Sequence, residues 1–189
     1  MIASITVTYY PDLAALQRQL DSVAEQVHTM VVVDNGSPAP VLAALRALCT
    51  KLGALLLPLP HNQGIGAAQN AGIAQARQQG AQWVLLLDQD SEATPQMVDT
   101  LHAALQAQPR AAAAGPSSID QRTGTHSFFV TDPGQWPRRW QPEPGVPHAP
   151  IEVGFLIASG TLLRCAALGD TPPMRASWFI DHVDSEWCL

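Results

Sequence analysis

The sequence has few basic residues, and this limits what it can bind. Its 189 residues include 10 Lys and Arg against 16 Asp and Glu, which gives a net charge of −6. A surface so poor in positive charge has no patch that could compete for a nucleic-acid backbone, so we exclude nucleic-acid binding. If the protein binds phosphate, something other than a basic patch must neutralise it.

Long apolar runs are also missing. The runs VVVD, LLLPLP and WVLLLD each stop at Pro or Asp, whereas a membrane-spanning helix needs about 20 apolar residues. The N-terminal MIASITVTYY has no basic leader or cleavage site and has the pattern of a strand, so we expect no secretory signal. We therefore expect a cytoplasmic protein with no transmembrane segment, and keep peripheral association with the inner membrane as an alternative.

Cysteine is scarce and scattered. Cys49, Cys165 and Cys188 form no CxxC pair, and any disulfide would leave one of them unpaired. This suits a reducing compartment, in which the three are passive core residues.

The first 116 residues alternate short β-branched or Leu-rich runs with longer Ala/Gln/Leu segments of helical period. This pattern predicts an α/β fold in which a mostly parallel, Rossmann-like sheet is flanked by helices. We predict strands at Ile2–Thr8, Thr29–Asp34, Ala54–Leu59, Trp83–Asp88 and Ala111–Pro116. We predict helices at Leu13–Val27, Val41–Leu52, Gly66–Gln79 and Pro95–Gln108.

The remaining residues are less regular. Residues 132–150 contain six prolines and two tryptophans, too many prolines for a helix or a central strand, so we expect an extended loop. IEVGFLIASGTLLR, which follows, predicts a buried strand and a turn. The last residues, WFIDHVDSEWCL, bring a cluster of acids to the end of the chain.

Polar residues follow each of the first four predicted strands. These segments are Thr8-Tyr9-Tyr10, Asp34-Asn35-Gly36-Ser37, His61-Asn62-Gln63-Gly64 and Asp88-Gln89-Asp90-Ser91. In an open parallel sheet, ligands bind beyond the carboxyl ends of the strands, so all four should lie along one edge and face a ligand. Each segment alone is equally compatible with a turn or a helix cap.

Asp88 and Asp90 are the most informative pair. Residues two apart in an extended segment point the same way, so their carboxylates can approach one hard cation. Mg²⁺ and Mn²⁺ usually take one or two protein carboxylates and complete their shell with water and substrate phosphates. A DxD at the end of a WVLLL strand, in a chain without a basic patch, favours such a site.

The ordered segments ITVTYYPD, VVVDNGS, LPHNQGIGAAQNAGI, LLLDQDS, FLIASGTLLR and WFIDHVDSEWCL resemble the motif series of family 2 glycosyltransferases of the GT-A fold, across nearly the whole chain. The doubled Tyr, HNQGIGAAQN and FIDHVDSEW most resemble bacterial rhamnosyltransferases that use dTDP-L-rhamnose. The resemblance implies a nucleotide-sugar-binding half at 1–116 and the start of an acceptor-side half at 117–189, within one compact domain. Because the family continues beyond WCL with an Arg and further helices, we expect a chain truncated at its C-terminus.

Carried over residue by residue, the resemblance implies a role for each motif. Asp34 accepts the imide N–H of uracil or thymine, Thr8 and Tyr9 line the base pocket, and Asn62 and Gly64 border the nucleotide. Asp88 contacts the ribose or reaches the metal through water, and Asp90 is the direct ligand of Mg²⁺ or Mn²⁺. Asp184 is the catalytic base and Glu186 a later acid. Val183 replaces the usual Glu of that motif, which keeps Asp181 open as the alternative base.

The implied reaction is an inverting transfer of a sugar, L-rhamnose by the closest resemblance, from dTDP-L-rhamnose or a UDP-sugar. The acceptor is a hydroxyl of a cell-surface polysaccharide or a lipid-linked glycan. The alternative is a truncated module that binds the nucleotide sugar without transferring it.

Other motif interpretations fit less well. GIGAAQ imitates a dinucleotide fingerprint, but Gln69 occupies the third glycine position, which argues against an oxidoreductase. His61 and His182 have no partner at metal-ligand spacing. A nucleotidyltransferase would usually carry a Gly-rich basic loop after the first strand, and TVTYYPDLAAL has neither feature.

Overall fold

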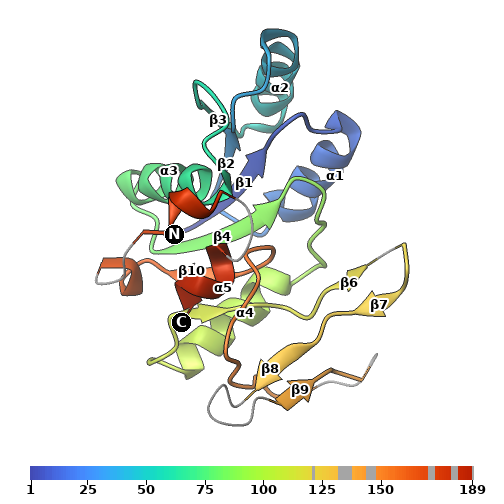
Figure 1. Ribbon diagram of the computed structural model, residues 1–189, viewed down its shortest axis with the longest axis vertical. Helices are drawn as coiled ribbons and strands as arrows, with labels where there is room; N and C mark the ends of the chain where they lie inside the picture. The colour runs from blue at the N-terminus through green and yellow to red at the C-terminus, as the bar shows by residue number, and fades with distance from the viewer. Residues whose placement is uncertain (121, 132–137, 144–147, 170–172, 180–182, 189) are drawn as a thin grey trace.

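The computed structural model describes residues 1–120, 122–131, 138–143, 148–169, 173–179 and 183–188 (Figure 1). Alternation of strands and helices fills the first half: β1 (Ile2–Thr8), α1 (Leu13–Ala24), β2 (Thr29–Asp34), α2 (Ala39–Leu52), β3 (Leu55–Pro58), α3 (Ile65–Gln78), β4 (Trp83–Asp88), α4 (Met97–Ala107) and β5 (Ala113–Ala114). The predicted order of elements is therefore confirmed. Strands β1, β2 and β4 match their predicted bounds, while β3 and β5 are shorter.

The second half adds short elements. They are β6 (Ile119–Asp120), β7 (Thr125–His126), β8 (Phe129–Thr131), β9 (Arg138–Trp140), β10 (Leu162–Arg164), the 3₁₀ turns η1 (Ala167–Gly169) and η2 (Ala176–Trp178), and α5 (Val183–Cys188). The expected extended loop at 132–150 is wrong at Arg138–Trp140, which pair antiparallel with β8 as β9. The rest of that prediction falls partly on 132–137 and 144–147, outside the described residues.

Six strands form the main sheet in the order β3-β2-β1-β4-β10-β5. All are parallel except β10, which pairs antiparallel with both β4 and β5. The predicted strand in IEVGFLIASGTLLR is thus confined to Leu162–Arg164, and the turn before it lies against β4.

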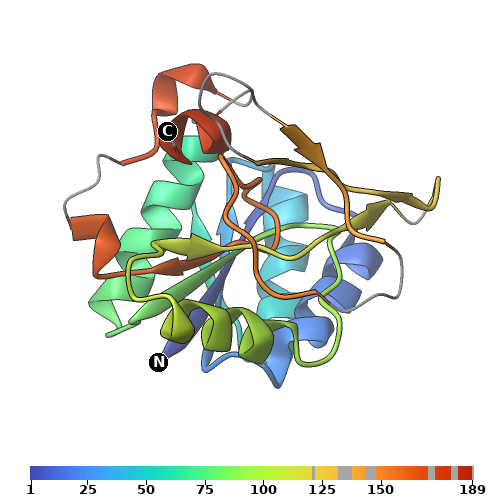
Figure 2. The ribbon, with the colours of Figure 1, turned by 90° about the horizontal axis from the view of Figure 1, so that it is seen from below.

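Helices cover both faces of the sheet (Figures 1 and 2). Alternate residues of the strands feed two apolar clusters, as the period of a strand requires. Helix α3 and the C-terminal segment cover one face, while α1, α2 and α4 cover the other. Strand β1 is buried along its whole length, as expected for a strand of a parallel sheet that helices cover on both faces.

Local sequence signals fix the helix ends. The Asp12 carboxylate accepts hydrogen bonds from the N–H groups of Ala14 and Ala15 at the start of α1, a side-chain cap for otherwise unpaired donors. Gly53 ends α2 with φ +70°, a conformation that favours glycine.

Two of the three cysteines are free and buried in these cores, as predicted: Cys49 and Cys165. Burial raises the pKa of the Cys49 thiol to about 11. Within the part of the chain that the structure describes, no helix is both long and apolar enough to cross a membrane.

Candidate functional site

The carboxyl ends of β1, β2 and β4 meet at one edge of the sheet. Thr8 pairs with Asp34 across β1 and β2, and Val7 pairs with Asp88 across β1 and β4. The parallel register therefore brings together the polar residues that the sequence placed after separate strands.

Asp34 is fully buried at the end of β2. One carboxylate oxygen accepts a hydrogen bond from the Ser37 N–H (2.9 Å), and the other from the Thr8 hydroxyl (3.3 Å). Each oxygen keeps a second lone pair. A base that bonded to Asp34 would have to displace the atoms that now cover it.

The loop before α3 is fastened to the loop after β2. The Asn35 carboxamide donates to the Asn62 side-chain oxygen (3.0 Å) and to the Gly64 carbonyl (3.3 Å), and it accepts from the Gln63 N–H (2.9 Å). Gly64 has φ +84°, and a Cβ there would lie 2.6 Å from the Phe179 carbonyl oxygen. The backbone at the start of α3 can therefore approach its neighbours as closely as it does only with glycine at this position.

Tyr9 and Tyr10 form an exposed aromatic pair after β1. Their rings meet edge to face with centroids 4.8 Å apart. The Tyr9 N–H donates to the Gln89 side-chain oxygen (3.0 Å), which ties this pair to the loop between Asp88 and Asp90. Tyr10 has φ +48°, an uncommon conformation for a bulky residue.

Three carboxylates gather beyond β4. Asp88 ends the strand, whereas Asp90 lies in the turn that follows, so the extended alternation expected for the pair does not hold. They nevertheless interact electrostatically, and Asp184 of α5 joins them.

The environment of Asp88 makes its ionised form costly. Crowding by protein atoms raises the pKa of Asp88, although the residue keeps an exposed surface, and the charges of Asp90 and Asp184 raise it further. A hydrogen bond from Ser159 lowers that pKa. Desolvation and like charges both penalise a carboxylate, and a bound cation would relieve both effects.

Asp184 is held by backbone. Its Oδ2 accepts the N–H of Ala158 at 3.0 Å, which fixes the carboxylate against the turn that precedes β10. Asp181 and the side chain of Glu186 lie outside the described residues, and so does His182.

The arrangement fits a Mg²⁺ or Mn²⁺ ion. The described residues contain no cluster of three or more His, Cys, Asp or Glu side chains placed as a metal centre. These ions, however, need only one or two protein carboxylates when substrate phosphates and water supply the other ligands. The salt bridges between described residues use Glu92 and Asp120 rather than Asp88 or Asp90.

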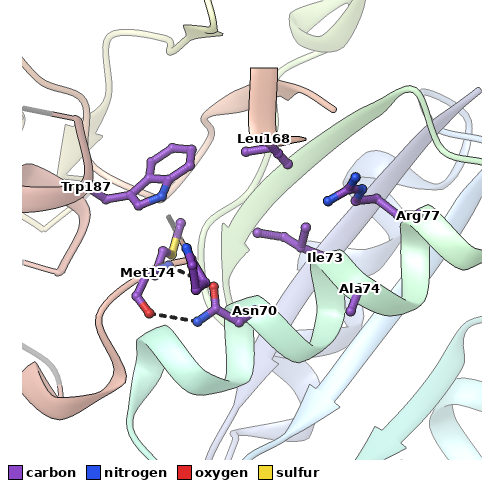
Figure 3. Close-up of a pocket in the computed structure, with 8 residues that line it drawn as sticks. Asn70, Ile73, Ala74, Arg77, Leu168, Met174 and Trp187 are labelled. Atoms are coloured by element: carbon purple, nitrogen blue, oxygen red, sulfur yellow. Dashed lines mark hydrogen bonds between the residues drawn. The ribbon is translucent and has the colours of Figure 1, made fainter. Parts of the chain in front are cut away.

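A separate hollow of about 230 Å³ lies between α3 and the C-terminal segment (Figure 3). Asn70 exchanges two hydrogen bonds with the backbone of Met174 at its floor (2.8 and 3.0 Å). Trp187 and Leu168 face Ile73 across it. None of the predicted site residues lines this hollow.

Sequence reasoning did not single out Gln89, Ala158 and Ser159 individually. Gln89 lies between Asp88 and Asp90, and this position was the one sequence feature that could have marked it as part of the site. Ala158 and Ser159 lie in a turn about 70 residues after Asp88 in the sequence, and no local sequence pattern marks a contact over that separation.

Comparison with known proteins identifies the family to which the sequence is similar. A profile described as glycosyl transferase family 2 matches residues 4–170. A protein of Shigella flexneri named dTDP-rhamnosyl transferase RfbF is 30% identical over 188 residues, which are 100% of this chain and 62% of that protein. The chain thus spans less than two thirds of the length of this relative.

Solved structures share the fold. The match to TarS 1–349 of S. aureus in complex with UDP has a TM-score of 0.65 at 18% identity. It covers 100% of this chain and 54% of the TarS chain. A second match is to the mannosyltransferase PcManGT of Pyrobaculum calidifontis in complex with GDP-Man and Mn²⁺, with a TM-score of 0.66 at 17% identity. It covers 98% of this chain and 50% of the PcManGT chain. The predicted GT-A fold class is confirmed.

Proposed function

The chain belongs to glycosyl transferase family 2, and from this premise we propose that it transfers L-rhamnose from dTDP-L-rhamnose to a hydroxyl group. The acceptor is a cell-surface polysaccharide or a lipid-linked glycan. The rhamnosyl donor is supported by the name of the 30% identical relative, together with the resemblance of the doubled Tyr and the HNQGIGAAQN segment.

The observation that carries the proposal is the meeting of Asp34, Asp88, Asp90 and Asp184 at one edge of a sheet. Asp34, with Thr8 and Tyr9, binds the base, and Asn62 and Gly64 border the nucleotide. Helix α3 begins directly after Gly64, and its first N–H, that of Ile65, donates to the Phe179 carbonyl (2.7 Å). In this proposal, the donor is bound by residues 1–116, through side chains that follow several different strands.

Catalysis needs one proton to be removed and one leaving group to be stabilised. Asp184 takes the proton of the acceptor hydroxyl, which then attacks the anomeric carbon from the face opposite the nucleoside diphosphate and inverts its configuration. Such general-base help is worth about 10²–10⁴ in rate. Asp90, with Asp88 beside it, would hold a divalent cation that stabilises the charge of the departing diphosphate by several kcal/mol.

A thermal-shift panel tests the donor. The protein is melted with dTDP-L-rhamnose, a UDP-sugar, CDP and GDP-mannose, each with and without Mn²⁺. At 100 times Kd a ligand stabilises by about 2.7 kcal/mol, which corresponds to roughly 5–10 °C for a chain of this size. We expect the largest shift with dTDP-L-rhamnose and Mn²⁺. A larger shift with GDP-mannose, or none with any donor, would reject the proposal.

A further inference from the structure

Two consecutive N–H groups after β1 are held by side chains from other loops. The Tyr9 N–H donates to the Gln89 side-chain oxygen (3.0 Å), and the Tyr10 N–H donates to the Ser37 hydroxyl oxygen (3.1 Å). Tyr10 has φ +48°, a conformation that a bulky residue keeps only where its surroundings hold it. Because both rings are exposed, burial does not fix the Tyr9–Tyr10 segment, and it depends on these two hydrogen bonds.

The register of the sheet brings Gln89 to this segment. Val7 pairs with Asp88 across β1 and β4, so the first residues beyond the two strands lie side by side. The far end of the loop after β4 is fastened separately, because the Ser159 hydroxyl donates to the Ser91 hydroxyl oxygen (2.9 Å). Gln89 is therefore carried by a loop that is itself held, and it can support its neighbour.

We propose that Gln89 is a positioning residue that holds the Tyr9–Tyr10 segment against the loop of Asp88 and Asp90. Recognition of the base then depends on the same loop that is proposed to hold the cation. The inference rests on the proposed function, in which Tyr9 lines the base pocket. A glutamine suits this position, because its neutral carboxamide accepts the N–H without adding to the negative charge of the two acids beside it.

Gln89→Leu tests this role, since leucine has a similar volume but cannot accept the Tyr9 N–H. Gln89→Glu keeps an acceptor oxygen at the same reach and is the conservative variant. Gln78→Leu makes the same change at an exposed residue, at the end of α3 away from the candidate site, and is the matched control. For each protein, calorimetry in Mn²⁺ measures the Kd of dTDP and that of methyl diphosphate, which carries the diphosphate without the nucleoside.

We expect Gln89→Leu to weaken dTDP binding about fivefold, since one lost hydrogen bond has about that effect. Its affinity for methyl diphosphate should equal that of wild type, because the Tyr9–Tyr10 segment is proposed to contact the nucleoside and not the diphosphate. Gln89→Glu adds a negative charge that weakens both ligands alike, so the ratio of their Kd values should stay that of wild type. Gln78→Leu should keep both Kd values, and all the proteins should melt at the wild-type temperature without ligand.

The outcomes separate the two proposals. If wild type binds dTDP with Mn²⁺ and Gln89→Leu binds it equally well, the role of Gln89 is rejected and the proposed function stands. Equal losses of dTDP and methyl diphosphate in Gln89→Leu also reject it, because the damage then lies at the cation and not at the base. So does a Gln89→Glu protein whose ratio of Kd values falls as far as that of Gln89→Leu. If wild type binds no dTDP with Mn²⁺, the proposed function fails, and this inference fails with it.

Discussion

The acids of the site differ in what surrounds them. Asp34 is closed in, with both oxygens bonded to protein, whereas Asp88 keeps an exposed surface and has Asp90 and Asp184 as neighbours. A buried carboxylate with fixed partners suits recognition. A carboxylate crowded by like charges suits a cation, because the cation removes the repulsion.

Asp184→Asn should separate chemistry from binding. The amide oxygen of Asn still accepts the Ala158 N–H, so the local structure is kept, but Asn cannot take a proton. In a sugar-transfer assay we expect turnover to fall by about 10²–10⁴, with dTDP affinity within a few-fold of wild type. Asp181→Asn is the control. If Asp184→Asn keeps near-normal turnover and Asp181→Asn abolishes it, the base is Asp181.

Asp34 should select pyrimidines that carry a proton at position three. A carboxylate accepts that N–H in uracil and thymine, but it meets a bare lone pair in cytosine, and an unpaired buried acceptor costs about 1–3 kcal/mol. UDP and dTDP should therefore bind at least about tenfold more tightly than CDP by calorimetry. Equal affinity for CDP would remove Asp34 from the base pocket. Comparing ligands avoids mutating a residue that also holds Ser37 and Thr8.

At the scale of elements, helix α3 packs unusually close to the sheet at Gly72. A Cβ on this residue would lie 2.5 Å from a methyl of Ile5 and 3.0 Å from one of Val33. The small residue lets the helix that begins at the candidate site lie directly on strands β1 and β2. Its position in the sequence, in GIGAAQNAG, shows helical period but not this contact.

Gly72→Ala should therefore destabilise the protein although alanine favours helix by about 1 kcal/mol. Overpacking of a core costs about 1–3 kcal/mol, and we expect a net loss in the free energy of unfolding measured with urea. Gly169→Ala is the control, since a Cβ there has no atom within 4 Å, and its effect should stay within about 0.5 kcal/mol. A Gly72→Ala protein as stable as wild type would show that α3 can shift outward freely.

Local periodicity predicted the strands and helices of the first half because each buries a face set by its own residues. It could not predict that Leu162–Arg164 would insert antiparallel between β4 and β5, because that pairing joins segments about 50 to 80 residues apart. The same limit hid Ser159. The DQD pair was singled out by its position after a strand, and Asp90 lies in a turn rather than in the extended segment that was expected.

At the scale of the whole molecule, charge decides how a diphosphate can be bound. The net charge is −6, and acids gather at the edge of the sheet where the donor is proposed to lie. An anionic ligand approaching this edge meets repulsion that is not screened at short range. A divalent cation would reverse the local sign, so the charge distribution and the DQD segment together predict metal dependence.

We therefore expect dTDP binding to depend on metal through Asp90. Calorimetry in Mn²⁺ and in EDTA should show at least about tenfold weaker binding without metal. Asp90→Ala in Mn²⁺ should bind as weakly as wild type in EDTA. Asp21→Ala removes the same charge from an exposed position in α1, so it controls for net charge and should keep wild-type affinity. If Asp21→Ala and Asp90→Ala have equal effects, the role of Asp90 is long-range electrostatics rather than ligation. If the affinities with and without metal are equal, the diphosphate is bound by other means.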